Sequence, residues 1–349
     1  MGDVDTLARH ALRATGPRDR LVEALLVRLP RVGLDGVLRD LDRGAEACDV
    51  PGDAAGRGFM WDPADRDDPD WTPQGLACTR SGDVLLAAWY GRRRWLVRTQ
   101  GSRVSVVDLR DAERPRYRHV LLVAPRRRLG SPGVRPVPVH AGGIAVLGDL
   151  LYVADTIRGV RVFRLSDVAR VPAPPRRRTG GYTTHGYRYV LPELLQLRLR
   201  LRSGPAHLRC SFLSVGTVEG RLSLVIGEYG RKGTTPRLVR YPLDPVTGLP
   251  VTDPDGRCAP LEVHENQPHR MQGVAVEGST WVVSASSGRG NPGDLHVGRP
   301  GAFRRHRGVL PPGPEDLDWS RPGERLWGLT EWPGQRWVFP VDVGRWTGT

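Results

Sequence analysis

The feature that most constrains this chain is a repeated pair of short apolar runs, which begins after residue 70. Each unit has a small or polar opening, an apolar run, a glycine-centred turn, and a second apolar run that ends in polar or aromatic residues. The five openings are residues 73–76, 140–144, 209–212, 271–274 and 314–317. Turns at 81–83, 147–149 and 277–279 fall where a hairpin needs them. The repeat therefore predicts a regular succession of β-hairpins.

Further strands are expected after the hairpins. They are residues 104–109, 117–123, 160–165, 187–191, 238–243, 261–264 and 336–341. Four strands per unit and central repetition are typical of a propeller blade. The sequence thus predicts an all-β fold, a β-propeller of five blades. A sixth blade could lie within 176–208, where residues 194–202 alternate strictly. The last unit ends without a fourth strand, and residues 57–62 could supply it by closing the ring.

Residues 1–45 differ from the rest and are predicted to form a helical N-terminal extension to a propeller at 46–349. Leu21, Ala24, Leu25 and Leu29 recur at helical spacing. Two or three short helices are expected, packed against the main body.

The net charge of +14 is carried almost entirely by arginine, since Lys232 is the only lysine. Arginine clusters stand at 92–94, 126–128 and 176–178, each beside Gly or Pro, which predicts three separate loops. No helix-turn-helix, zinc-finger or RNA-binding pattern accompanies them, so we expect no nucleic-acid partner. The cysteines lack C-x-x-C spacing, which argues against a zinc site. No signal peptide or membrane-spanning stretch is visible, and a cytoplasmic monomer without membrane contact is expected.

The hairpin geometry predicts one polar mouth on the propeller axis. The start of each inner strand and the end of the next strand lie on the same face, because the two strands are antiparallel. The residues expected there are Gln74, His140, Asp155, Ser211, Glu228, Gln272, Ser286, Glu315, Asp316 and Glu331. Trp89, Tyr90, Tyr229 and Trp332 are expected on its wall.

Five carboxylates in a basic chain suggest chemistry, because buried like charges repel. A bound calcium, magnesium or manganese ion, a neighbouring arginine (Arg158, Arg188 or Arg289), or a raised pKa would each relieve the repulsion. The predicted catalytic residues are Glu315, Asp316, His140, Glu331 and Asp155. The predicted metal ligands are Glu315, Asp316, Asp155 and Glu228. The predicted substrate contacts are Gln74, Trp89, Tyr90, His185, Glu228, Tyr229, Gln272 and Trp332. Each residue also has a structural interpretation as a turn cap or as a link between blades.

Several motifs resemble a family of uncharacterised actinobacterial proteins usually described as secreted. They are residues 71–75, 117–123, 140–144, 151–156, 186–190, 313–317 and 330–334. The resemblance covers about residues 45–342 and implies an actinomycete source but no specific chemistry. This chain lacks the export signal of that family. It also lacks a family cysteine near residues 59–61, which the resemblance implies would pair with Cys48. Both departures favour an intracellular form that is recruited to a specialised pathway. In layout the chain also resembles calcium-dependent lactonase propellers.

Three functions remain open on the sequence. The first is an enzyme on a small molecule, using metal-assisted or general acid–base chemistry for hydrolysis, elimination or cyclisation in specialised metabolism. The second is a propeller that binds a sugar or another ligand without catalysis. The third is a protein-interaction scaffold. No organic cofactor is expected, because no nucleotide-binding pattern is present.

Overall fold

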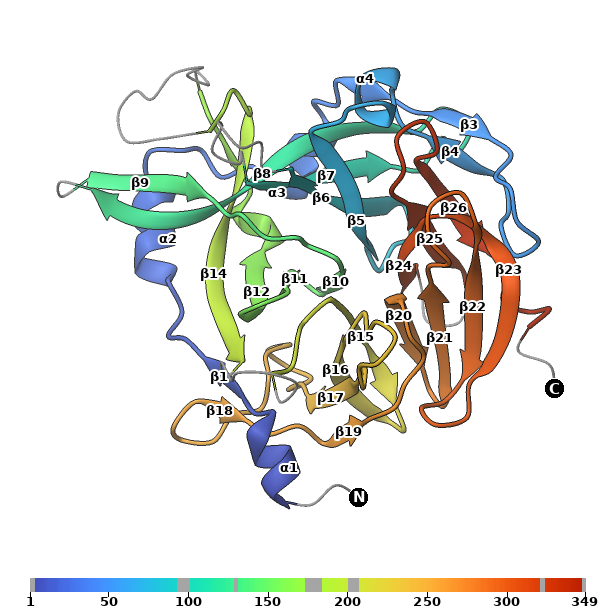
Figure 1. Cartoon of the computed structure of the whole chain (residues 1–349). Coiled ribbons are helices and arrows are strands. Elements are labelled where there is room, and N and C mark those ends of the chain that lie inside the picture. Colours follow the sequence, from blue (N-terminus) through green and yellow to red (C-terminus); the bar gives the residue numbers. More distant parts are fainter. Residues whose placement is uncertain are drawn as a thin grey trace.

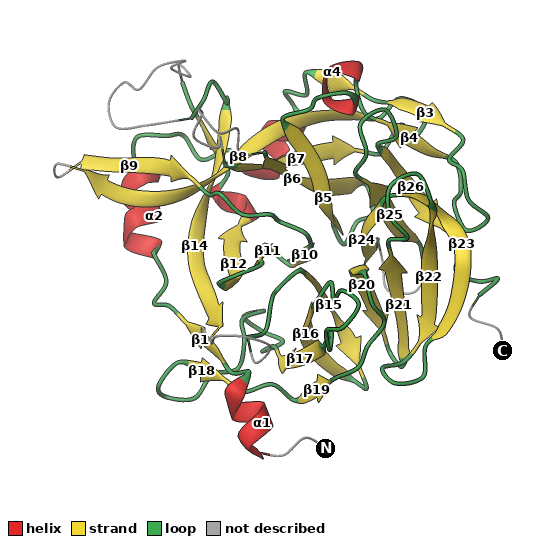
Figure 2. Ribbon diagram, viewed as in Figure 1, coloured by secondary structure: helices red, strands yellow, loops and turns green. Residues whose placement is uncertain are grey.

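The computed structural model describes residues 4–92, 101–128, 131–172, 184–199, 207–320 and 324–346 of the 349-residue chain. β-Strands dominate these residues, and the helices are short (Figure 2). The α-helices are α1 (Val4–Arg9), α2 (Asp19–Leu26), α3 (Gly33–Leu38) and α4 (Pro63–Arg66). Over the described residues, no helix has the length and apolar character needed to span a bilayer.

The largest sheet has 13 strands and contains two runs of four antiparallel strands joined by a parallel pairing of β8 with β14. The first run is β5 (Trp71–Cys78), β6 (Val84–Gly91), β7 (Ser102–Asp108) and β8 (Arg116–Arg128). The second is β10 (Ile144–Leu147), β11 (Leu150–Asp155), β12 (Gly159–Arg164) and β14 (Tyr189–Leu199). Short strands at its margins are β1 (Leu12–Ala14), β2 (Arg43–Gly44), β9 (Ser131–Pro136), β13 (Ala169–Arg170) and β18 (Arg257–Cys258).

Three smaller sheets complete the body, and each is antiparallel. One holds β15 (Phe212–Val218), β16 (Arg221–Gly227), β17 (Leu238–Pro242) and β19 (Glu262–His264). The next holds β20 (Met271–Glu277), β21 (Thr280–Ala285), β22 (Pro292–Gly298) and β23 (Arg304–Pro312). The last holds β24 (Pro314–Trp319), β25 (Leu326–Thr330), β26 (Trp337–Val341), β4 (Gly58–Met60) and β3 (Glu46–Cys48).

The sheets are arranged radially around one axis (Figure 1), which is the architecture of a β-propeller. The strands β5, β10, β15, β20 and β24 surround this axis, and each contacts the next around the circle. Their backbones approach closely at glycines. A Cβ atom at Gly273 would lie 2.5 Å from the Cα of Asp316, and one at Gly143 would lie 2.5 Å from the amide nitrogen of Leu213. Only glycine permits such contact between neighbouring inner strands.

The predicted hairpins are confirmed, as is the strand that joins the two ends of the chain. β4 pairs with β26 through Met60–Trp337 and Phe59–Val338. Residues 194–199 belong to β14, which pairs with β12 as the fourth strand of its run. Within the blades, β22 and β23 were not expected from the sequence, and neither were β1, β2, β3, β9, β13 and β18. The exposed start of β23 carries arginines and a histidine rather than an alternating apolar pattern.

The helices before residue 45 pack against the outer strands, as expected. α2 contacts β8, β9 and β14, and α3 contacts β7 and β8. The expectation that residues 126–128 form a loop is wrong, because they lie in β8 and pair with β9. Proline at position 125 suggested a turn, yet a long edge hairpin tolerates it. Residues 93–94 and 176–178 of the other arginine clusters lie outside the described residues.

Candidate functional site

Two glutamates and two glutamines meet at one end of the axis. Gln74 donates its side-chain amide to Glu331 Oε2 at 3.1 Å, and Gln272 donates to Glu315 Oε1 at 2.8 Å. The two glutamates lie close enough for each to shift the pKa of the other. We call Glu315 and Glu331 the axial glutamate pair. The inner strands β5, β20 and β24 and the end of β25 supply these four residues, which the sequence placed at one mouth.

β-Bulges explain how these side chains come together. The strand register shifts between Pro73 and Gly75, between Met271 and Gly273, and between Pro314 and Leu317. These shifts leave Gln74, Gln272, Glu315 and Asp316 out of the regular ladder. A bulge turns a side chain away from the alternating pattern of a strand. The predicted irregular start of the last inner strand, with two adjacent acids released from alternation, is thereby confirmed.

Both members of the axial glutamate pair have raised pKa values. Burial raises the pKa of Glu315 well above its ordinary value, and the nearby negative charge of Glu331 raises it further. Burial also raises the pKa of Glu331. Ionising both adjacent carboxyl groups is unfavourable because the two negative charges repel. The titrations of the two groups are therefore expected to be coupled. Glu315 is 2% exposed, whereas Glu331 is only half-buried. The solvent side of the pair is therefore Glu331.

The Asp316 side chain links neighbouring inner strands through backbone hydrogen bonds. Its Oδ2 atom accepts the backbone N–H groups of Leu76 and Ile144, both at 3.0 Å, so it joins β24 to β5 and β10. The side chain is completely buried, and burial raises its pKa well above the ordinary value against the opposing effect of these N–H groups. Asp318 repeats the contact one step along by accepting from the N–H of Cys78 at 2.8 Å. Asp316 Oδ2 thus has backbone partners, whereas the buried Oδ1 atom has no hydrogen-bond partner among the described residues, and the catalytic role expected of Asp316 stays a prediction.

Asp318 gives a pH-dependent test of these contacts. Burial raises its pKa from 3.8 to about 7, although the N–H of Cys78 opposes this. Below pH 3.8 the Asp318 carboxyl group is protonated in both the folded and the unfolded chain. Between 3.8 and about 7 the unfolded chain loses its proton first, so stability falls as pH rises, by at most about 4 kcal/mol. Asp318→Asn keeps the acceptor oxygen and removes the titration.

We expect Asp318→Asn to become more stable relative to the natural chain as pH rises across this window, because only the natural chain loses stability through this carboxyl group. Denaturant unfolding at several pH values measures it. Parallel stability curves for the two proteins would contradict the assignment.

The carboxylates of Asp155 and Glu228 are held by arginines of their own sheets. Arg161 donates to Asp155 from Nε at 3.0 Å and lies 2.8 Å away through Nη2. Arg237 donates to Glu228 at 2.7 and 3.0 Å. Of the three remedies for carboxylate repulsion, these two acids thus use a neighbouring arginine.

The arginines named from the sequence, Arg158, Arg188 and Arg289, do not supply these ion pairs. Arg158 contributes a backbone N–H to Asp155, Arg188 pairs with Asp40, and Arg289 lies over the ring of Trp332 at 5.7 Å. The effective arginines stand in the third strands, β12 and at the start of β17. Because they do not stand at the start of a first strand or at the end of a second strand, the hairpin repeat does not point to them.

The aromatic residues and histidines divide between the surface and the core. His140 stacks on Tyr90 with ring centroids 4.4 Å apart, and both side chains reach solvent. Surrounding protein lowers the pKa of His140 and of the exposed His185. Tyr229 and Trp332 are half-buried.

The expectation that Trp89 lines the mouth is wrong. Trp89 is completely buried and donates its indole N–H to Ser105 Oγ at 2.8 Å. The burial of Trp89 follows from side-chain alternation along β6, which places Trp89 and Tyr90 on opposite sides of the strand.

Trp89 belongs to a buried Ser–His–Asp chain that resembles a catalytic triad. Ser105 Oγ lies 2.9 Å from His119 Nδ1, and His119 Nε2 lies 3.0 Å from Asp65 Oδ2. All three residues are at most 7% exposed. Ser105 is sealed beneath Trp89, so no substrate can reach its hydroxyl in this structure. This Ser–His–Asp hydrogen-bond network is therefore part of the protein core.

No group of three or more His, Cys, Asp or Glu side chains within the described ranges is placed to hold a metal ion. Asp155 and Glu228 are occupied by arginine, and the amide nitrogens of Gln74 and Gln272 face the axial carboxylates. Amide orientation is assigned from such partners. A glutamine in this orientation offers the pair a donor rather than a ligand oxygen.

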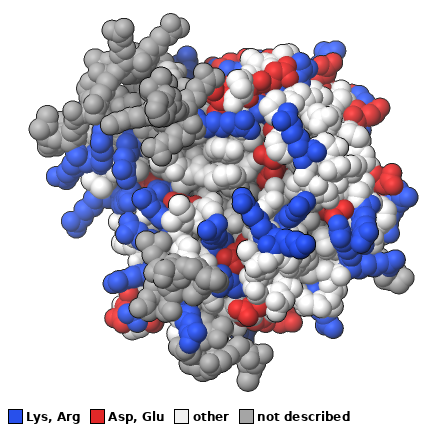
Figure 3. Space-filling model, in the orientation of Figure 1, with Lys and Arg blue, Asp and Glu red and all other residues white. Residues whose placement is uncertain are grey.

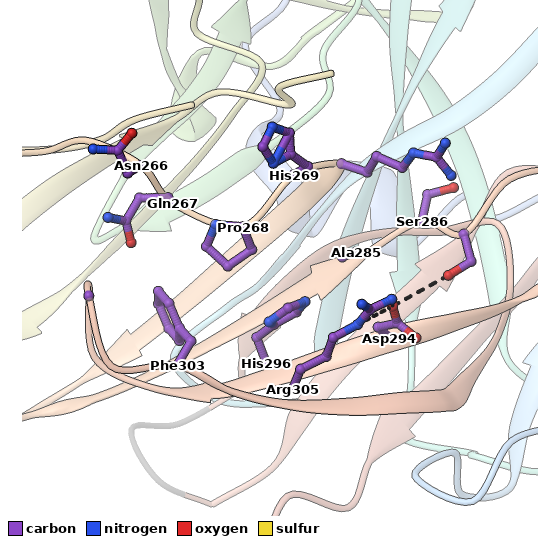
Figure 4. Close-up of a pocket in the computed structure, with 13 residues that line it drawn as sticks. Asn266, Gln267, Pro268, His269, Ala285, Ser286, Asp294, His296, Phe303 and Arg305 are labelled. Carbon is purple, nitrogen blue, oxygen red and sulfur yellow. Dashed lines mark hydrogen bonds and ion pairs between the residues drawn. The ribbon is translucent and has the colours of Figure 1, made fainter. Parts of the chain in front are cut away.

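A cavity of about 740 Å³ lies beside the sheet of β20–β23. Its lining includes Ser286, which was expected at the axial mouth, together with His269, Gln267, Asp294, His296, Phe303 and Arg305 (Figure 4). The last three stand on or next to β22 and β23, the strands that the sequence pattern did not reveal. Alternation in a recognised β22 would have placed Asp294 and His296 on one face.

No protein-family profile matches the chain, and no curated protein matches it. Solved structures with a similar layout include a family 117 glycoside hydrolase from Zobellia galactanivorans. That protein is 11% identical, with a TM-score of 0.46, over 87% of this chain and 92% of the other. A glucose dehydrogenase is 13% identical, with a TM-score of 0.41, over 86% and 96%. The propeller domain of Myceliophteria thermophila Cps50 (Swd1) is 13% identical, with a TM-score of 0.36, over 77% and 83%. At these scores none of the three informs the function.

Proposed function

We propose that this chain is an enzyme that acts on a small polar molecule by general acid–base catalysis at the axial glutamate pair. The observation that carries the proposal is the approach of two glutamates, Glu315 and Glu331, each of which accepts a hydrogen bond from a glutamine amide. Perturbed carboxyl pairs of this kind cluster at catalytic sites, because one acid is kept protonated beside one base.

The roles within the pair follow from burial. Glu315 lies deeper and keeps the proton, whereas Glu331 reaches the solvent side and is the base. Glu331 accepts a proton from a bound water or substrate hydroxyl, and the oxygen left behind attacks the substrate. The pair then holds two protons and returns one to the leaving group. Gln74 and Gln272 hold the two carboxyl groups in place throughout.

A five-bladed count belongs to the same proposal. Five inner strands contact one another in a closed circle, and each begins a run of at least four strands joined by antiparallel pairings. The strand β14 joins two of these runs into one sheet by pairing with β8. This crossing explains why five blades are distributed over four sheets.

The charge of the surface supports a neutral or anionic substrate. Lys and Arg side chains are spread over the face drawn in Figure 3, in keeping with a net charge of +14. A positive surface potential repels cations on approach.

A divalent cation is the alternative, because carboxylate and amide oxygens are the ligands that such ions prefer. It would require both glutamates to ionise and both glutamines to turn their oxygens inward. Calorimetric titration with calcium, magnesium and manganese tests it. Micromolar binding of one of these ions that is lost in Glu315→Gln would favour a bound metal ion over a proton shared by the two glutamates.

The catalytic proposal is tested by hydrolysis assays with nitrophenyl esters, nitrophenyl glycosides and lactones. We expect one class to be turned over, with kcat falling about 10²- to 10⁴-fold in Glu331→Gln, the range for removal of a general base. The fold should survive, because the amide is isosteric and half-buried. Glu113→Gln, a surface change outside the axial site, is the control.

Unchanged kcat in Glu331→Gln would contradict the assignment of the base. Absence of turnover in every class would count against the enzyme and favour a structural link between blades.

A further inference from the structure

A second polar cavity lies away from the axial glutamate pair. It is formed by the connection from β19 to β20, the end of β21, and the outer strands β22 and β23. In Figure 4, Gln267 and Pro268 face Phe303 across the cavity, and His296 stands between Phe303 and Arg305. Its volume of about 740 Å³ falls within the range of small-molecule sites, roughly 300–1,000 Å³.

One buried acceptor in this cavity lacks a partner. Gln267 is 4% exposed and lines the cavity. Its amide nitrogen donates to the carbonyl oxygen of Glu265 at 2.6 Å, which fixes the orientation of the amide. The oxygen Oε1 has no hydrogen bond to any described residue. An unpaired buried acceptor costs about 1–3 kcal/mol, so a donor from a ligand would be favoured here.

The charged side chains of the lining are Asp294, Arg305 and Arg270, and the first two form an ion pair. Asp294 accepts from Arg305 Nε at 2.9 Å and from the backbone N–H of Gly308 at 2.9 Å, so this acid and this base neutralise each other. Burial, with the charge of Arg305, lowers the pKa of His296 to about 4. Its neutral ring therefore offers one donor and one acceptor near pH 7.

An apolar surface completes the set. Phe303 is half-buried and lies edge-on to His296, with ring centroids 6.4 Å apart and planes at 85°. An exposed aromatic ring can pack against the C–H face of a ligand, while neutral donors and acceptors pair with its hydroxyl groups. Hydroxyl groups are the donors that the free Gln267 oxygen requires.

We infer that this cavity is a binding site for a neutral, multiply hydroxylated molecule of the saccharide class. Gln267 accepts from one ligand hydroxyl, His296 pairs with another, and Phe303 packs against the carbon skeleton. The inference stands apart from the proposed catalysis, because it uses none of the four axial residues.

Calorimetric titration and saturation-transfer NMR test it with glucose, galactose, mannose, cellobiose and maltose as probes. We expect at least one sugar to bind, with affinity at least tenfold weaker in Phe303→Ala and in Gln267→Leu. Phe303 is half-exposed, so its removal should leave the fold intact, and the Phe303 variant still answers if Gln267→Leu misfolds. Val246→Ala, at a side chain 91% exposed outside the cavity, is the matched control and should bind as the natural chain does.

The alternatives are measured in the same experiment. Sulfate and glucose 6-phosphate probe an anion site built on Arg270 and Arg305. Binding of these anions without any neutral sugar would overturn the proposal. So would the absence of sugar binding at about 10 mM, since that limit corresponds to less than about 3 kcal/mol of binding energy. Equal affinity in Phe303→Ala and the natural chain would place the sugar elsewhere.

Discussion

Asp316→Ala is expected to lower the free energy of unfolding by about 2–6 kcal/mol. The change removes the acceptor for the backbone N–H groups of Leu76 and Ile144 at the centre of the ring. Each buried N–H left without a partner costs about 1–3 kcal/mol. The measurement is denaturant unfolding near pH 5, where the ionisation of the buried carboxyl contributes less than at neutral pH.

Asp318→Ala is the matched comparison for this prediction. Asp318 lies two residues further along β24 than Asp316. It accepts one backbone N–H group from a neighbouring inner strand, that of Cys78, whereas Asp316 accepts two. Its loss should be about half as large. Similar small losses in both variants would show that the inner strands do not depend on carboxylate bridges.

Asp65→Ala is expected to lower the free energy of unfolding by about 3–5 kcal/mol, the usual cost of leaving a buried charge unpaired. Asp65 is 2% exposed and lies 2.7 Å from Arg103, 2.9 Å from Arg43 and 2.6 Å from the hydroxyl of Tyr117. Burial alone would raise its pKa, but the hydrogen bond with His119 and these charges hold that pKa well below its usual range. Its ionised form therefore stabilises the fold at neutral pH.

The same network predicts a loss of stability in acid. Burial and the charge of Arg103 lower the pKa of His119 from 6.5 to about 3. Between these values the unfolded chain binds a proton that the folded chain does not, so stability falls as pH drops. His119→Gln should flatten this dependence. Asp67→Ala, at an exposed ion pair with Arg66, is the control for Asp65 and should change the unfolding curve little.

The hairpins were predictable because each is encoded by neighbouring residues. An apolar run predicts the first strand, a glycine predicts the turn, and a second apolar run predicts the second strand. Closure of the ring through residues 57–62 was predictable for the same reason, since the last unit lacked one strand. The outer strands β22 and β23 were not, because β23 begins with exposed arginines and a histidine that obscure alternation.

The candidate site was predictable in part. Gln74, Gln272, Glu315 and Glu331 were placed together by counting positions from the ends of strands, and the bulges sustain that arrangement. The ion pairs of Asp155 and Glu228 were not visible, because their arginines come from a third strand whose register the sequence does not state. Trp89 could have been placed correctly, since strand alternation forbids it to share a side with Tyr90.

The most direct test of the account is a pH titration of the glutamate carboxyl carbons by ¹³C NMR, in the natural chain and in Glu315→Gln. The account predicts two coupled steps for the axial glutamate pair, with one well above the ordinary glutamate value of 4.5. It also predicts that the pKa of Glu331 changes in Glu315→Gln, because its proton-sharing partner is gone. Independent titration of both groups near 4.5, unaffected by the substitution, would contradict the shared proton and the catalytic site built on it.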